Sequence, residues 1–219
     1  MDEKQSHAAF MSALTTEHFV LQTAANATVS DAAARSSLYV FSLSSSLVAL
    51  GFASRSRDAF VPFIAIVLPA IFVLGVFTVM RLVDTALENM RCLAGIARIR
   101  RYYRTLSPEA DVYFAARHGR WPEGHSDPAL HLGPLMAFLS TSASMVAFIN
   151  SVVAGVGIAV FAGDRLGTDA TALAMVLGVA VAGGLIVAFV VYERWRFRIF
   201  ERAEPGEARE AQRGTTRQP

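Results

Sequence analysis

The side chains with the most evident chemistry are three histidines in the middle of the chain. His118, His125 and His131, with Glu123 and Asp127 between them, offer the imidazole and carboxylate groups that transition metals accept as ligands. Their spacing matches no zinc or metalloprotease motif, and histidines spaced loosely along a connection are usually solvated. We therefore expect no metal here, and a transition-metal site in this segment is the alternative.

No other catalytic signature is present. The sequence contains no phosphate-binding glycine loop and no nucleophile motif that would pair a serine with a histidine. Its single cysteine, Cys92, forms no disulfide within the chain. We predict a protein that is not an enzyme, with no catalytic residues and no cofactor.

The elements that carry these side chains are strongly apolar. Hydrophobic residues make up 53% and charged residues 17% of the 219 residues, against about 45–50% and about 25% in soluble domains. Four stretches contain no Asp, Glu, Lys or Arg: 36–54, 59–80, 132–163 and 170–192. Each has about the 20 residues, or more, that a helix needs to cross about 30 Å of hydrocarbon. In the third stretch, Gly133-Pro134 places the helix at about 135–161.

These stretches predict the fold class. Lipid cannot hydrogen-bond to the backbone, so each span is expected to be helical. We predict an all-α integral-membrane four-helix bundle of two transmembrane hairpins, with an amphipathic N-terminal helix and a cytoplasmic helical extension. The expected segments are an N-terminal cytoplasmic helix (1–35), a first hairpin (36–80), a cytoplasmic helical connection (81–131), a second hairpin (132–192), and a basic juxtamembrane helix with a disordered tail (193–219).

Two segments outside the spans carry apolar faces. Residues 16–34 are interpreted as an amphipathic helix that lies on the membrane or packs under the bundle; a plain extension of the first span is the alternative. Between Leu82 and Ala97, apolar residues recur every three or four positions and require a partner. That partner is either the N-terminal helix or the same helix of another subunit. A short helix is expected from Ser107-Pro108 through Arg117.

The basic residues predict the orientation. If the spans are as above, 17 of the 20 lysines and arginines lie on the side that holds both termini and the middle connection. Cytoplasmic loops carry such an excess, so both termini are expected in the cytoplasm. The basic charge is then a mark of topology, and no nucleic-acid partner is expected.

Small residues at helical spacing predict where the spans pack. Residues of this kind let helix backbones approach closely. The third span has a run with a spacing of four, and the fourth span has similar runs. The predicted packing residues are Ala143, Ala147, Ser151, Gly155, Ala159, Gly178, Ala182 and Gly184. The third and fourth spans are expected to pack on each other or across a subunit interface.

The few polar groups inside the spans leave two interpretations open. Ser42, Ser45 and Ser46 share one helical face, and Asn150 is the most polar residue of the third span. They line a narrow aqueous path in an oligomer, or they form local hydrogen bonds while Asn150 clamps two helices. Pro69 is expected to kink the second span.

The end of the fourth span predicts contact with lipid headgroups. Aromatic and basic residues alternate there, as is typical of an anchor in the inner leaflet. The residues are Tyr192, Arg194, Trp195, Arg196 and Arg198. Membrane lipids are therefore expected partners.

Four segments near the N-terminus resemble a known family. They are EHFVLQTA (17–24), ATVS (27–30), RSSLYV (35–40) and LVALGF (47–52). Over residues 17–52 the chain is similar to a family of uncharacterised bacterial four-span membrane proteins, which implies a bacterial inner membrane and no particular activity. In layout, the chain also resembles the small pore-forming effectors of bacterial antiphage systems.

Together these features predict a non-enzymatic bacterial inner-membrane protein, a homo-oligomer that forms or gates a pore. The alternative is a membrane scaffold or accessory subunit that docks a cytoplasmic protein through residues 81–131.

The orientation can be tested at the loop between the third and fourth spans. In a chain with Cys92→Ala, a Thr168→Cys substitution should react with a membrane-impermeant thiol reagent added to intact cells, because this loop is expected outside. Labelling is read by mass shift. If labelling occurs only after the cells are broken, the predicted topology is reversed.

Overall fold

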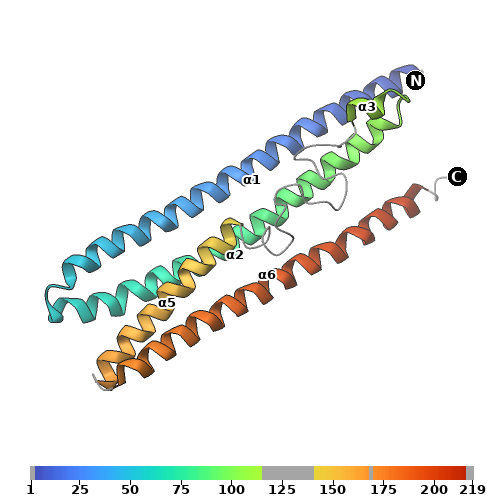
Figure 1. The fold of residues 1–219 in the computed structure, drawn as a ribbon. Helices are drawn as coiled ribbons and strands as arrows, with labels where there is room; N and C mark the ends of the chain where they lie inside the picture. The colour runs from blue at the N-terminus through green and yellow to red at the C-terminus, as the bar shows by residue number, and fades with distance from the viewer. Residues whose placement is uncertain (1–2, 115–140, 168–169, 216–219) are drawn as a thin grey trace. The chain divides into compact units, whose positions relative to one another are not determined.

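The structure, a computed structural model, describes residues 3–114, 141–167 and 170–215 (Figure 1). Every element in these ranges is a helix, which confirms the all-α prediction for the described part of the chain. The helices are α1 (Glu3–Ala53), α2 (Arg57–Arg104), α3 (Ala110–Phe114), α5 (Ser142–Leu166) and α6 (Thr171–Thr215).

Four of these helices are long and apolar enough to cross a membrane. The most apolar windows of α1, α2, α5 and α6 have mean hydropathies of 1.5, 2.7, 2.2 and 2.7. Each helix overlaps one of the four charge-free stretches, so the predicted number of apolar helices is confirmed. The expected start of the third span near residue 135 lies outside the described residues.

Helices α1 and α2 continue well beyond their apolar stretches. They have 51 and 48 residues, which at 1.5 Å per residue corresponds to about 76 and 72 Å, against about 30 Å of hydrocarbon. No break separates an N-terminal helix from the first span at Arg35. The reason is local: the first 50 residues contain neither glycine nor proline, so nothing interrupts the helix.

The chain forms two compact units, and α1 and α2 contribute to both. The first unit comprises Met1–Arg35 and Asp84–Ser142. Within it, Leu21 of α1 packs on Gly95 of α2, where an added Cβ would lie 2.9 Å from a leucine methyl. The rings of Phe10 and Tyr102 meet edge-on at 5.6 Å. The apolar stripe of α2 therefore has the N-terminal part of α1 as a partner.

Two predicted ends differ from the structure. Helix α3 begins at Ala110, later than Pro108, while Ser107 caps it by accepting a hydrogen bond from the Ala110 amide at 3.2 Å. A disordered tail is expected from about residue 204, whereas the structure continues α6 as a helix to Thr215. Glutamate, alanine, arginine and glutamine dominate this stretch and are good helix formers.

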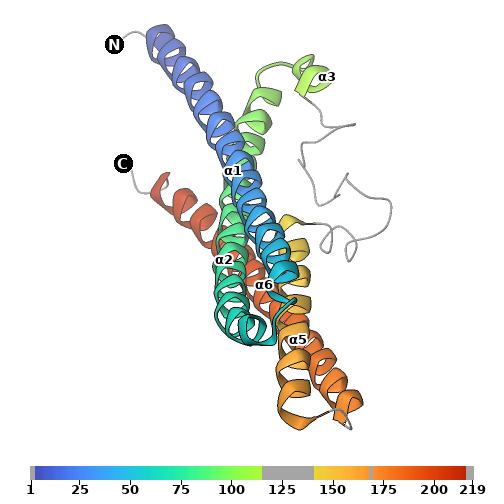
Figure 2. The same cartoon turned by 90° about the vertical axis from the view of Figure 1, so that its left-hand side faces the viewer.

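The second unit comprises Ser36–Val83 and Ala143–Pro219. Within it, α5 and α6 lie side by side in both views (Figures 1 and 2). Gly167, with φ of +83°, ends α5, and its amide bonds to the Gly163 carbonyl at 3.2 Å. This turn sends the chain back along α5.

The contact between α5 and α6 is centred on two glycines. A Cβ on Gly155 would lie 2.5 Å from the Gly178 carbonyl oxygen and 2.9 Å from the Ala182 Cβ. A Cβ on Gly178 would in turn lie 2.5 Å from the Gly155 oxygen and 2.8 Å from the Ala159 Cβ. Of the predicted packing residues on α5, Ala143, Ala147 and Ser151 are also buried, at 5%, 6% and 4% exposure. Gly184 is different, since nothing lies within 4 Å of its Cβ position.

This contact predicts a difference between two glycines of the bundle. Gly155→Leu should lower the free energy of unfolding by about 1–3 kcal/mol because the side chain must push two backbones apart. Gly184→Leu is the matched control: it gains the same helix propensity in open space and should leave the free energy of unfolding unchanged or raise it by up to about 1 kcal/mol. Thermal unfolding in detergent measures both. Equal effects of the two substitutions would contradict this packing.

Candidate functional site

Asn150 on α5 is a buried polar residue of the second unit that bonds to two other helices. Its side chain is 4% exposed. Its Oδ1 accepts a hydrogen bond from the Tyr39 hydroxyl of α1 at 3.2 Å, and its Nδ2 donates to the Phe72 carbonyl of α2 at 3.2 Å. One amide thus joins three helices, and we call these three residues the polar clamp.

Two further features of the neighbouring helices make the clamp possible. Tyr39 is completely buried, so its ring fills apolar space while its hydroxyl reaches the amide. Gly75 of α2 faces Asn150, and a Cβ there would overlap the amide. Glycine at position 75 therefore lets α2 come close enough for its Phe72 carbonyl to accept the hydrogen bond.

The serines of α1 do not all point the same way. The Ser46 hydroxyl bonds back to the Ser42 carbonyl at 2.8 Å, and both residues are partly buried. Ser45 is exposed on the surface of the chain. The predicted shared face thus splits, with Ser46 against the interior of the unit and Ser45 turned outward.

A buried carboxylate at the end of the fourth apolar stretch was not singled out by sequence reasoning. Glu193 of α6 is 1% exposed, and its Oε2 accepts a hydrogen bond from the Ser144 hydroxyl of α5 at 3.5 Å. In the sequence Glu193 is simply the first charged residue after a span. Its burial depends on α5, which only the fold brings alongside.

The predicted anchoring residues and the kink residue are at the surface. The Tyr192 and Trp195 rings are 6.5 Å apart, and Trp195 is 56% exposed. Arg194 and Arg198 are exposed, and Arg196 is partly buried. Pro69 lies inside α2 with its side chain exposed.

The first unit has a polar layer between α1 and α2. Thr28 donates a hydrogen bond to the Asn89 Oδ1 at 3.2 Å, and Thr85 donates to the Asp31 Oδ2 at 3.5 Å. Asp31 also receives Arg35 Nε on both oxygens, at 3.0 and 2.9 Å. Such paired polar groups fix which residues of two helices lie opposite each other.

The described residues offer no metal centre. Among them, no group of three His, Cys, Asp or Glu side chains is placed to hold an ion. His118, His125 and His131, which carry the metal alternative, lie outside the described residues. Cys92 is 8% exposed within α2, so its thiol is shielded from reagents in water.

The polar clamp predicts an energetic coupling between α1 and α5. Asn150→Ala should destabilise the protein by about 1–3 kcal/mol because it removes the acceptor of a fully buried hydroxyl. Tyr39→Phe should cost less, because it leaves only the Asn150 Oδ1 without a donor and keeps the hydrogen bond from Asn150 Nδ2 to the Phe72 carbonyl. A double-mutant cycle in detergent unfolding should give a coupling of about 0.5–2 kcal/mol. Strictly additive effects would show that the two side chains do not interact.

We compared the chain with known protein families, curated proteins and solved structures. No protein-family model, no curated protein and no solved structure matches the chain.

Proposed function

We propose that this chain is a non-enzymatic, multi-pass protein of a bacterial inner membrane, with both termini in the cytoplasm, and that several copies assemble to form or gate a pore. Four apolar helices of sufficient length support the membrane placement. The concentration of arginine in the termini and the middle connection supports the orientation. The family resemblance over residues 17–52 supports the bacterial membrane placement alone, because it implies no particular activity.

The main support for a pore is that serine hydroxyls of α1 face outward from the chain. Only 6% of the most apolar window of α1 is buried within the chain, the lowest share of the four helices. Ser44 and Ser45 lie in this helix and are exposed. In lipid, polar side chains favour the bundle interior or a water-filled cavity over the acyl chains. This surface of α1 is therefore the one suited to face other copies or a shared aqueous path.

The continuity of α1 suggests how such a pore is gated. The same uninterrupted helix holds Phe10 and Leu21, which pack in the first unit, and Ser45, which is exposed in the second. A partner or signal that acts on the first 35 residues thus acts on the helix that carries the hydroxyls.

A second function, a membrane scaffold that docks a cytoplasmic protein through residues 81–131, is favoured by α3. Val112 and Tyr113 on this helix are 81% and 80% exposed. Large apolar side chains with this exposure in water commonly mark a protein-binding surface when they form a patch.

Cysteine accessibility during conductance separates the two functions. In a Cys92→Ala background, Ser45→Cys protein reconstituted in liposomes should conduct ions and lose current when a charged methanethiosulfonate reagent is added. Val179→Cys is the matched control, because Val179 is 73% exposed on α6 and is expected to face lipid. Its current should not change.

Each contrary result has a defined meaning. Liposomes that never conduct, with or without added cytoplasmic extract, would overturn the pore and leave the scaffold. If the reagent leaves the current of the Ser45→Cys protein unchanged, as it should for the Val179→Cys protein, α1 does not line the pore.

A further inference from the structure

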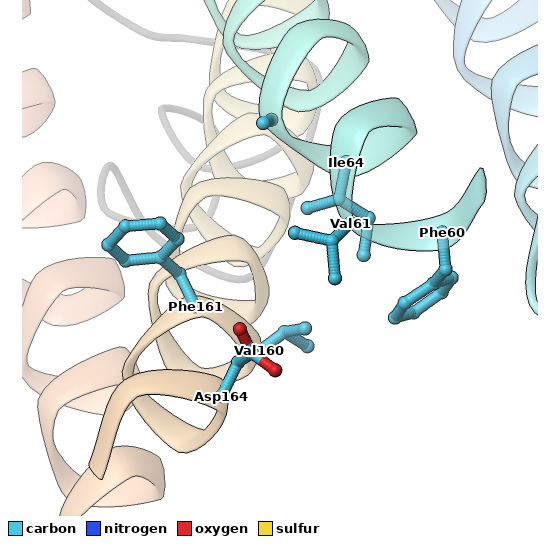
Figure 3. A pocket seen from close by; sticks show the side chains of 7 residues that line it. Phe60, Val61, Ile64, Val160, Phe161 and Asp164 are labelled. Carbon is cyan, nitrogen blue, oxygen red and sulfur yellow. The ribbon is translucent and has the colours of Figure 1, made fainter. Parts of the chain in front are cut away.

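One pocket of the second unit combines apolar walls with a carboxylate. It lies between α2 and α5 and has a volume of about 340 Å³. Val61 and Ile64 of α2 face Phe161 of α5 across it, and the Asp164 carboxylate lies at one end (Figure 3). We call this pocket the mouth.

Two larger grooves adjoin the mouth. The first groove, of about 450 Å³, lies among α2, α5 and α6 and shares Ile64, Ala65 and Phe161 with the mouth. The second groove, of about 380 Å³, lies among α1, α2 and α5 and shares Phe60, Ile64 and Val160 with it. Each volume is in the range of about 300–1,000 Å³ that is usual for small-molecule sites.

Both grooves extend from the mouth toward the middle of α5. The first reaches Val153, 11 residues before Asp164, and the second reaches Phe148, 16 residues before it. At 1.5 Å per residue these depths are about 16 and 24 Å, and each is at least half of the roughly 30 Å hydrocarbon core. The first groove is open because Ala65, Ala154 and Gly157 line it with little side-chain volume. An acyl chain as long as one leaflet that starts at the mouth would therefore fit within either groove.

A carboxylate lines the mouth, and a guanidinium lies over one of its rings. Asp164 lines the mouth, and the next residue, Arg165, holds its guanidinium 4.7 Å from the centre of the Phe161 ring. Phe161 itself lines the mouth and the first groove. A headgroup at this position meets a carboxylate and a guanidinium within one turn of helix, which suits a zwitterion: an ammonium for Asp164 and a phosphate for Arg165.

We propose that the mouth and its two grooves bind one diacyl glycerophospholipid with a primary-ammonium headgroup, phosphatidylethanolamine in the simplest case. The two acyl chains occupy the two grooves, the phosphate pairs with Arg165, and the ammonium donates hydrogen bonds to Asp164. This site rests on the proposed membrane placement and is independent of whether the assembly conducts.

The headgroup is tested with three lipids of matched acyl chains. Purified full-length protein in detergent is titrated with phosphatidylethanolamine, phosphatidylcholine or phosphatidylglycerol, and bound lipid is counted by native mass spectrometry. Phosphatidylcholine has a cation without N–H donors, and phosphatidylglycerol has no cation. Phosphatidylethanolamine should bind about two- to fivefold more tightly than either, the range of an exposed ion pair.

Four variants assign the preference to the site. Asp164→Asn should remove the preference and leave the weaker lipids unchanged, while Arg165→Gln should weaken all three. Ala65→Phe should fill the groove and reduce binding of every lipid. Ala70→Phe is its matched control, because Ala70 is exposed on the same helix and lines neither groove. It should bind like the parent chain. Lipid-free melting temperatures show that each variant is folded.

Two results would overturn the site: equal binding of the three headgroups by the parent chain, or equal binding by the Ala65→Phe and Ala70→Phe proteins. Failure of the membrane placement is recognised separately, because the chain would then remain monodisperse in buffer without detergent. A protein that prefers phosphatidylethanolamine but never conducts would retain the lipid site and lose only the pore.

Discussion

The hydrogen bonds of the Asn150 amide constrain how three of the apolar helices pack together. A polar group buried among apolar helices costs about 1–3 kcal/mol when it is left unpaired. Here the amide, the Tyr39 hydroxyl and the Phe72 carbonyl satisfy one another. Because a step of one residue moves a helix side chain by about 100° around the axis, only one register of α1 and α2 against α5 keeps both bonds.

The second constraint is the close approach of backbones at glycines. Gly75 makes room for the Asn150 amide, and Gly155 and Gly178 bring α5 and α6 into contact. In lipid, apolar side chains gain little by leaving the acyl chains, so close packing and polar contacts must hold the helices together. Both kinds of contact converge on α5, whose apolar window is 28% buried, the largest share of the four helices.

The helices were predictable from the sequence because a charge-free run of about 20 residues depends on neighbouring residues alone. Which helix contacts which could not be predicted from the sequence. Tyr39 and Asn150 are separated by 111 positions, and nothing in either local pattern pairs them. Gly178 and Gly184 both belong to small-residue runs of the same helix, yet only Gly178 has a neighbour within 4 Å. Spacing shows that a helix has a small face, and the fold decides which face is used.

The continuity of α1 is a different case, since its signal was present in the sequence. The absence of glycine and proline from the first 50 residues favours one helix, whereas the change from polar to apolar composition at Arg35 suggested a boundary. The composition of a segment shows whether it is surrounded by water or by apolar groups, and backbone propensity shows how far a helix can extend. In α1 the change from polar to apolar residues at Arg35 is therefore not the end of a helix.

The surface of the second unit has two kinds of region, apolar grooves and exposed hydroxyls, which differ in the size and polarity of their side chains. Between α2 and α5, alanines and a glycine leave grooves whose walls are apolar, which suits acyl chains. On α1, exposed hydroxyls at Ser44 and Ser45 suit water or another protein surface. In the proposed assembly, copies would meet at the exposed hydroxyls of Ser44 and Ser45. The second groove uses Leu43 and Ser46 of the same helix, so lipid binding and oligomerisation would involve neighbouring residues of α1.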